Sequence, residues 1–92
     1  MKLSQRSASA KAAKLGNWTL KGNVIARGFR FVDFADAMRF VNRVARLAEA
    51  ANHHPDIAIS YNRVRLALTT HDAGGLTEKD FKLASKINKL MK

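Results

Sequence analysis

The sequence contains no cysteine, and this absence excludes disulfide bonds, thiolate nucleophiles and cysteine-ligated zinc sites. It also lacks long apolar runs: no stretch approaches the length of a membrane-spanning helix, and the first 14 residues have no signal-peptide core. Those 14 residues are basic and rich in Ser and Ala, as in an organellar transit peptide, but the pattern of a folded domain already begins at Trp18. We therefore expect a cytoplasmic protein without a membrane segment.

Acidic residues are scarce. Seven Asp and Glu stand against 17 Lys and Arg, which gives a formal net charge of +10 that would attract an anionic ligand, nucleic acid or an acidic partner. A solvated helix face is the commoner interpretation of basic ridges, and no zinc finger, RNP-like motif or aromatic-interleaved basic strand accompanies them here. We therefore expect no specific nucleic-acid binding. The two ridges with helical spacing are Arg39, Arg43 and Arg46, and Lys79, Lys82, Lys86 and Lys89.

The chain is short for a self-sufficient core. Its 92 residues suffice for one compact domain, which we assign to residues 1–92, but small domains bury a low fraction of their surface on folding. Hydrophobic residues make up 47% of the chain, an ordinary globular composition. We expect a homo-oligomer, because sheet edges or an uncovered sheet face need a partner.

The periodicity of apolar residues predicts the order helix, strand, strand, helix, strand, strand, helix. This order fits an α+β fold, in which a four-stranded antiparallel sheet has helices packed on one face. The helix that begins near Asp33 must end before Pro55, because the residue preceding a proline is pushed out of helical geometry. The other expected elements are a helix over 4–15, strands over 18–20, 24–31, 57–61 and 64–69, and a helix opened by a capping box of Thr77 and Asp80.

The second pair of strands predicts where the histidines lie. A two-residue loop at 62–63 makes Tyr61 face Val64, and the same register places His54 opposite His71. The alternation of apolar residues with others in both strands predicts that each strand has one buried and one exposed side. All three histidines of the chain gather at one end of the sheet, at loop positions held by rigid elements.

At these residues the sequence resembles the pterin-4a-carbinolamine dehydratase family. The resemblance runs from about Trp18 to the last helix. It implies that the substrate is a 4a-hydroxytetrahydropterin, the carbinolamine left by an aromatic amino-acid hydroxylase, which is dehydrated to quinonoid dihydropterin without a metal or redox cofactor. The residues that carry it are Glu49, His53-His54-Pro55, Tyr61, His71 and Asp80, and the string from Thr69 to Thr77.

The same resemblance implies roles for these residues. His53 and His71 are implied to be the acid and base on either side of the 4a carbon, and His54 to bind or assist. Histidine suits both tasks because its ordinary pKa, about 6.5, lies close to neutrality. Asp80 would orient a histidine, and Trp18 would belong to the rim. The implied pocket wall consists of Glu49, Pro55, Thr69 and Thr70.

Simpler interpretations stay open for several of these residues. The two adjacent histidines could simply form a polar helix terminus, without a catalytic role. Asp80 could simply cap the last helix. Glu49 can pair with Arg46 one turn earlier instead of serving a site. A zinc site is disfavoured, because the spacing of the three histidines matches no common zinc motif.

The resemblance also implies partners and one alternative function. It implies a homodimer or homotetramer and a functional link to an aromatic amino-acid hydroxylase. The alternative is a non-catalytic module of the same fold, which serves as a dimerisation cofactor of a homeodomain transcription factor or as an assembly protein. Such a module could lose a histidine without consequence, whereas all three are present here.

Overall fold

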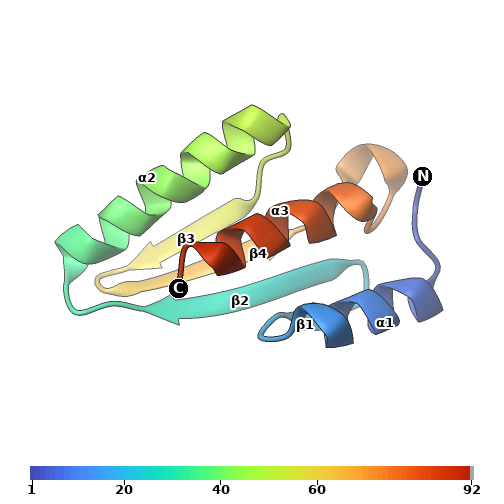
Figure 1. The fold of residues 1–92 in the computed structure, drawn as a ribbon, viewed down its shortest axis with the longest axis horizontal. Helices are drawn as coiled ribbons and strands as arrows, with labels where there is room; N and C mark the ends of the chain where they lie inside the picture. The colour runs from blue at the N-terminus through green and yellow to red at the C-terminus, as the bar shows by residue number, and fades with distance from the viewer. Residues whose placement is uncertain (92) are drawn as a thin grey trace.

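The computed structural model describes residues 1–91. Within this range the chain forms three α-helices and four strands in the order predicted, with a short 3-10 helix before the last helix (Figure 1). The α+β class and the order α-β-β-α-β-β-α are therefore confirmed. The elements are α1 (Gln5–Leu15), β1 (Thr19–Lys21), β2 (Val24–Arg30), α2 (Phe34–Ala51), β3 (Asp56–Ser60), β4 (Arg63–Leu68), η1 (His71–Ala73) and α3 (Glu78–Lys89).

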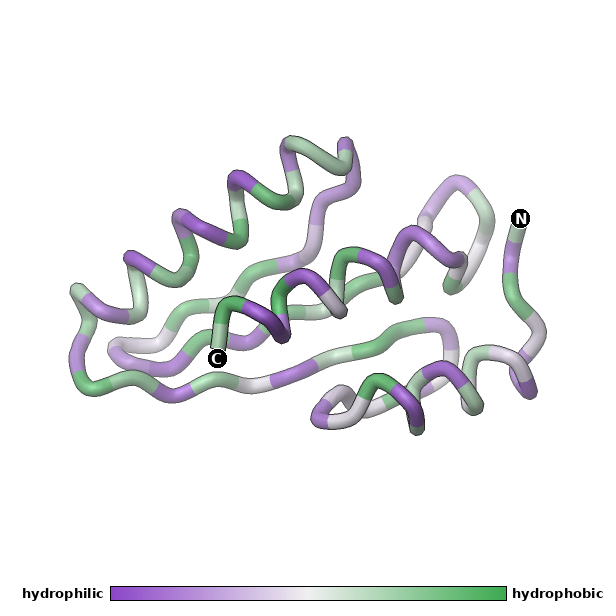
Figure 2. Tube along the Cα trace, in the orientation of Figure 1, coloured by the Kyte–Doolittle hydropathy of each residue, from purple (hydrophilic) through white to green (hydrophobic). Residues whose placement is uncertain are grey.

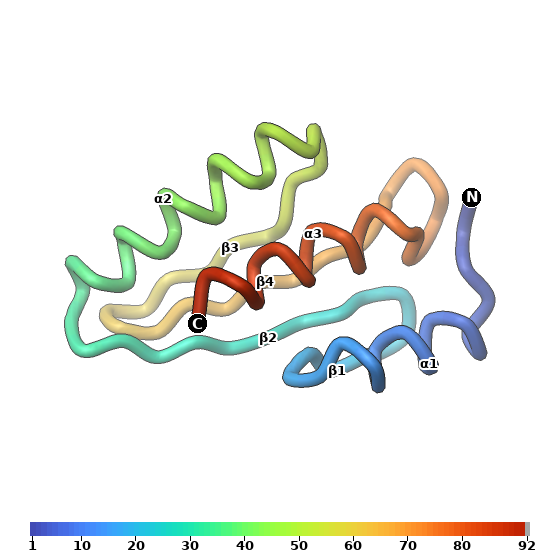
Figure 3. The backbone as a smooth tube through the Cα atoms, in the orientation of Figure 1, coloured from blue at the N-terminus to red at the C-terminus, as the bar shows by residue number. Residues whose placement is uncertain are grey.

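The strands form one antiparallel sheet in the order β1-β2-β4-β3. β2 and β4 are central although they are far apart in the sequence, and β1 and β3 are the edges. After β2 the chain runs back along α2 and then enters β3 (Figure 3). In the sheet, β3 lies on the side of β4 that faces away from β2. The β3–β4 hairpin places β4 beside β2, with Ile25 paired with Leu68 and Phe29 with Val64.

One face of the sheet carries the core. Alternate residues of the central strands, such as Ile25 and Leu66, are fully buried, and the apolar sides of α2 and α3 pack on them. Figure 2 shows this pattern along both helices, where hydrophobic positions recur between hydrophilic ones. α1 adds Ala8 and Ala12 to the same core and contacts α3. Within residues 1–91, the opposite face of the sheet is left without a helix.

Polar side chains cap the starts of α2 and α3, and the second of these caps is the predicted capping box. The Asp33 carboxylate accepts a hydrogen bond from the backbone N–H of Asp36 at 2.8 Å and so begins α2. Thr77 and Asp80 form the capping box that begins α3. Both helices therefore begin where short polar side chains satisfy backbone N–H groups that have no partner inside the helix.

The turn between β3 and β4 lies one residue earlier than predicted. Ser60 pairs with Arg63, so the two-residue loop is 61–62. Asn62 is held in this loop by Phe31, whose backbone N–H donates to the Asn62 carbonyl and whose carbonyl accepts from the Asn62 amide. Tyr61 is the first residue of this turn and has a positive φ of +54°, which is uncommon for a tyrosine.

This shift changes two predictions. Ile59, not Tyr61, faces Val64. Extending the observed register sets His54 opposite Thr69, so the predicted pairing of His54 with His71 is wrong. β3 is also more open than its alternation predicted: every residue in it is exposed, with Ile59 at 41%, because β3 is an edge strand.

Candidate active site

The end of α2 determines where the paired histidines lie. Asn52 follows the helix in the left-handed conformation, with φ of 50° and ψ of 43°, and its backbone N–H bonds to the carbonyls of the last turn. The backbone N–H of His53 then donates to the Ala48 carbonyl at 3.1 Å. This tight ending turns the chain sharply, so His53 is largely enclosed while His54 is exposed.

His53 contacts a buried carboxylate. Its Nε2 lies 2.6 Å from Oδ1 of Asp80, which is 0% exposed. The other oxygen, Oδ2, accepts hydrogen bonds from the Thr77 backbone N–H at 2.9 Å and from the Thr70 hydroxyl at 2.8 Å. Asp80 therefore caps α3 and also contacts His53, so the capping role and the contact with a histidine are both present.

The contact selects which nitrogen of His53 is free. When Asp80 is ionised its carboxylate only accepts hydrogen bonds, and Nε2 of His53 then carries the proton that points at Asp80. Nδ1 is then the ring nitrogen left to exchange a proton with another molecule. The side chain of His53 is 11% exposed, so this nitrogen belongs to a ring that is fixed and only partly open to solvent.

His54 contacts a different carboxylate. Its Nε2 lies 2.6 Å from Oε2 of Glu49, in the last turn of α2, and the two side chains are 58% and 77% exposed. Among the ion pairs of residues 1–91, Glu49 pairs with His54 and not with Arg46. Exposed pairs of this kind stabilise a fold only weakly, so Glu49 mainly restricts the orientation of His54.

His71 is carried by the short helix η1. It is exposed, and its carbonyl accepts from the Gly74 backbone N–H at 3.0 Å, where Gly74 has a φ of +77°. A bridge between Thr70 and Gly75 closes this loop at its base. His71 follows directly after Thr70, whose hydroxyl donates to Asp80. Asp80 therefore holds both His53 and the start of the loop that carries His71.

A cavity of about 590 Å³ opens beside this anchor. The N-terminal segment forms one wall, because the Leu3 backbone N–H donates to the Leu76 carbonyl at 2.7 Å. This wall could not be predicted from the sequence, since no local pattern indicates that a segment docks on a distant loop. The lining residues are Met1, Lys2, Thr70, Asp72, Ala73, Thr77, Glu78 and Lys79.

Of three other predicted site residues, Pro55 and Thr69 follow the sequence positions of the histidine centre, and Trp18 lies elsewhere. Pro55 is half-buried between His54 and β3. The Thr69 hydroxyl donates to the Asn23 carbonyl at 2.7 Å and so fastens β4 to the β1–β2 turn. Trp18 does not form a rim near the histidines: it is 6% exposed, and its indole donates to Asn88 at the far end of α3 from Asp80.

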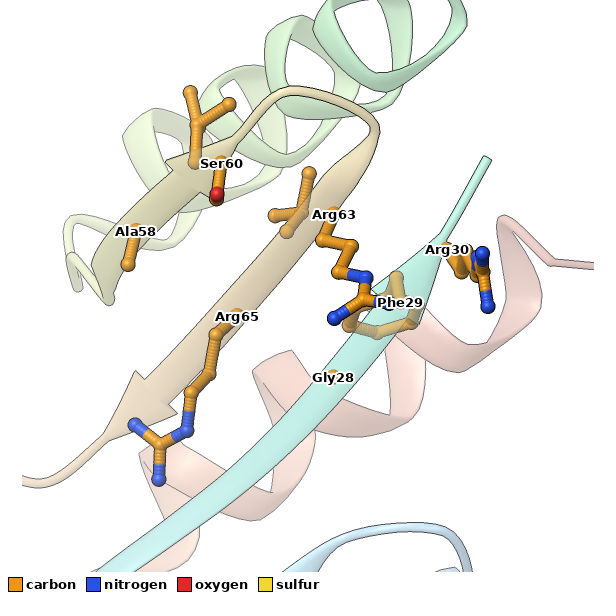
Figure 4. Close-up of a pocket in the computed structure, with 9 residues that line it drawn as sticks. Gly28, Phe29, Arg30, Ala58, Ser60, Arg63 and Arg65 are labelled. Atoms are coloured by element: carbon orange, nitrogen blue, oxygen red, sulfur yellow. The ribbon is translucent and has the colours of Figure 1, made fainter. Parts of the chain in front are cut away.

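A second hollow, of about 420 Å³, lies on the uncovered face of the sheet (Figure 4). Its floor is made by small residues such as Gly28, Ala58 and Ser60, with arginine side chains around it. Neither hollow is lined by a histidine, but the first includes Thr70 and Thr77, which contact Asp80, whereas the second shares no residue with that group. Across residues 1–91, no group of three or more His, Asp or Glu side chains is arranged to hold a metal ion. None of the helices in this range combines the length and the apolar composition that a membrane span requires.

Comparisons with known proteins cover nearly the whole chain. Residues 1–90 match the family described as pterin 4 alpha carbinolamine dehydratase. A protein of Chloroflexus aurantiacus is 58% identical over 90 residues, which are 98% of this chain and 97% of the relative. A protein of the archaeon Sulfurisphaera tokodaii is 48% identical over the same shares of both chains. Both carry the name pterin-4-alpha-carbinolamine dehydratase as a provisional assignment.

Two solved structures are also similar. A crystal structure described as a transcriptional coactivator/pterin dehydratase from Brucella melitensis superposes with a TM-score of 0.92 at 36% identity and covers 98% of both chains. A pterin dehydratase-like protein described as a RuBisCO assembly factor in the alpha-carboxysome superposes with a TM-score of 0.68 at 23% identity. It covers 80% of this chain and 88% of its own. That second likeness concerns the fold alone.

Proposed function

Because the chain belongs to the pterin-4-alpha-carbinolamine dehydratase family, we propose that it dehydrates a 4a-hydroxytetrahydropterin to quinonoid dihydropterin and water. The contact between His53 and the buried Asp80 is the observation that carries this proposal. A polar helix terminus alone would not need a fully enclosed carboxylate with three hydrogen-bond donors around it. In the cell, the reaction would regenerate the pterin used by an aromatic amino-acid hydroxylase, in tetrahydrobiopterin recycling.

The reaction is an elimination that two imidazoles can carry. The bond between C4a and the hydroxyl oxygen breaks, N5 loses its proton, and a C4a–N5 double bond forms. Protonation of the hydroxyl makes water the leaving group, and a base accepts the N5 proton. Electrons are neither gained nor lost overall, so the elimination as written uses no redox cofactor.

His53 suits the role of the base. Its Nδ1 is free to take the N5 proton, and the Asp80 carboxylate stabilises the imidazolium that results. His71, exposed on the η1 loop, is proposed to protonate the departing hydroxyl. His54, oriented by Glu49, is proposed to bind the substrate at the open side of the site.

The proposed pocket combines the predicted wall with the observed cavity. Thr70 belongs to both, because its hydroxyl contacts Asp80 and it lines the cavity of about 590 Å³. Glu49, Pro55 and Thr69 are proposed to complete the wall, with the carboxylate as an acceptor for the N–H groups of the pyrimidine ring. Substrate contacts would therefore come from the end of α2, the end of β4 and the η1 loop.

The direct test follows the disappearance of 4a-hydroxytetrahydropterin with and without the protein. We expect His53→Ala and His71→Ala each to lower the catalysed rate about 10²- to 10⁴-fold, the usual contribution of a general acid or base. Lys82→Gln, on the exposed side of α3, is the control and should leave the rate unchanged. A wild-type protein that does not exceed the spontaneous rate would exclude the activity, and full activity in both histidine variants would exclude their roles.

The alternative is a non-catalytic module for dimerisation, assembly or transcriptional coactivation. The Brucella melitensis protein is described by both functions, so the fold is compatible with either. The two are distinguished by a pull-down with wild-type protein and with a variant in which all three histidines are alanine. A stable partner that binds both proteins equally, together with no catalysis, would favour the module.

A further inference from the structure

Arg27 interrupts the apolar alternation of β2 on the face that the helices cover. It lies between the buried residues Ile25 and Phe29, and it is paired with buried Leu66 in β4. The guanidinium of an arginine at such a position must reach solvent or hydrogen-bond partners at the edge of the core. The side chain passes over the Phe29 ring, with its guanidinium carbon 4.5 Å from the ring centroid, toward the last turn of α3.

Asn88 fixes the guanidinium there. Its Oδ1 accepts from Nη1 of Arg27 at 2.6 Å and from the Trp18 indole N–H at 2.7 Å. Both lone pairs of this oxygen are therefore occupied, and the three side chains form one rigid group. Stacking on Phe29 holds the guanidinium plane from a second direction.

The charge of Arg27 has no carboxylate partner in residues 1–91. The ion pairs in this range involve other side chains, and the contact to Asn88 uses one of five guanidinium N–H groups. Partial burial lowers the pKa of Arg27 from its ordinary value, because the charged form has lost solvent. A nearby anion would offset this loss.

A cavity of about 460 Å³ lies against this guanidinium, where α1 and α3 both end. Its polar lining is cationic or neutral, and none of its lining side chains is acidic. Asp80 lies eight residues earlier on α3, about 12 Å away along the helix, so this cavity is separate from the histidines. The polar residues of this cavity, here the Arg27 cavity, are Lys14, Asn17, Arg27, Ser85, Asn88 and Lys89.

We propose that the Arg27 cavity binds a phosphate group. The planar guanidinium presents its free N–H groups in the fork that matches phosphate oxygens, and Asn88 already holds that plane in place. Lys14 and Lys89 lie in the last turns of the two helices, where their positive charge offsets the partial negative charge of the helix C-termini that an anion would otherwise meet. The cavity exceeds a single phosphate in size, so it also accommodates part of the molecule that carries the group.

Trp18 provides a direct readout. It is the only tryptophan, and its indole N–H shares one acceptor with Arg27, so its ¹H–¹⁵N resonance should move when an anion engages the guanidinium. The probe is inorganic phosphate, titrated at constant ionic strength against sodium chloride. We expect a saturable shift with the full chain, and affinity at least about tenfold weaker in Arg27→Gln, since hydrogen bonds to charged groups are among the strongest.

Matched variants separate this site from general basicity. Lys14→Gln with Lys89→Gln should weaken phosphate binding, whereas Lys82→Gln with Lys86→Gln removes the same charge outside the cavity and should leave it unchanged. If Arg27→Gln does not fold, the two double variants decide. No saturable shift, or the same shift in both double variants, would overturn the proposal.

A second titration with a single-stranded oligothymidylate identifies the source of the phosphate. Binding at Trp18 that is tighter than that of inorganic phosphate and falls steeply with salt supports a nucleic-acid backbone as the ligand. Binding no tighter than inorganic phosphate supports a small phosphorylated molecule. Both results require the resonance to respond in the wild type and to lose that response in the cavity variants.

Discussion

Asp80 has two tasks that are usually given to different side chains. It satisfies the N-terminus of α3 through the Thr77 N–H, and it holds Nε2 of His53. Under the proposed function, a substitution at this residue is therefore expected to affect stability and activity together, and the two effects need separate controls. Because the carboxylate is 0% exposed, neither contact can be replaced by water without rearrangement.

We predict that Asp80→Asn lowers both properties. An amide with its oxygen toward Thr70 and Thr77 presents its NH2 group to His53, so Nε2 of His53 either loses its acceptor or becomes the acceptor itself, which moves the ring proton to Nδ1. The free energy of unfolding should fall by about 1–3 kcal/mol, and the dehydration rate by about tenfold or more. Denaturant unfolding and the dehydration assay measure the two effects.

Asp33→Ala is the control for Asp80→Asn, because Asp33 caps α2 far from the histidines in sequence. It should lower stability by about 1 kcal/mol while leaving the rate unchanged. Equal losses of activity in the two variants would mean that Asp80 acts on the rate only through overall stability.

At the level of the elements, the sequence predicted the helices and strands well but not the β3–β4 turn. Periodicity and caps are local signals, so α2 could be located from Asp33 and Pro55. The turn was misplaced because Tyr61 is an unfavourable residue for a left-handed φ, and the contacts that impose it come from Phe31, far away in the sequence. Contacts of His53 with Asp80 and of Leu3 with Leu76 are likewise tertiary, so only the family resemblance pointed to the first.

The conformation of Tyr61 gives a stability prediction. Of the two loop residues only Tyr61 has a positive φ, as in a type II′ hairpin turn, where glycine is the favoured first central residue because it adopts this φ without steric cost. Tyr61→Gly should therefore raise the free energy of unfolding by about 0.5–1 kcal/mol. Tyr61→Val also removes the exposed ring but adds a β-branch at the same φ, and it should lower stability. Equal stability of the two variants would show that the ring, and not the backbone, determines the effect.

At the level of the whole molecule, the β3 edge of the sheet is the surface best suited to pair with a second chain. It is an edge strand with every residue exposed, and Ile57 and Ile59 lie on its helix-covered side. Exposed edges with apolar side chains pair readily with another chain. The homodimer or homotetramer expected from the sequence is therefore proposed to use this edge.

We predict an oligomer by sedimentation at micromolar concentration. Ile59→Lys places a charge on the β3 edge and should shift the protein toward the monomer, while its fold is kept because Ile59 is already 41% exposed. Gln5→Lys adds the same charge on exposed α1 and should leave the oligomer intact. A wild-type monomer would contradict the proposal, as would an oligomer insensitive to Ile59→Lys.

The sheet order also sets the moment at which the histidine centre comes into existence. The β3–β4 hairpin is a local contact, whereas β2 meets β4 only after a loop that contains all of α2 has closed. His53 and Asp80 belong to elements on opposite sides of this hairpin in the sequence, so a chain with only its local structure formed contains both residues but not their contact. Catalytic competence in this small protein would therefore arise late in folding, as a property of the completed topology and not of any single element.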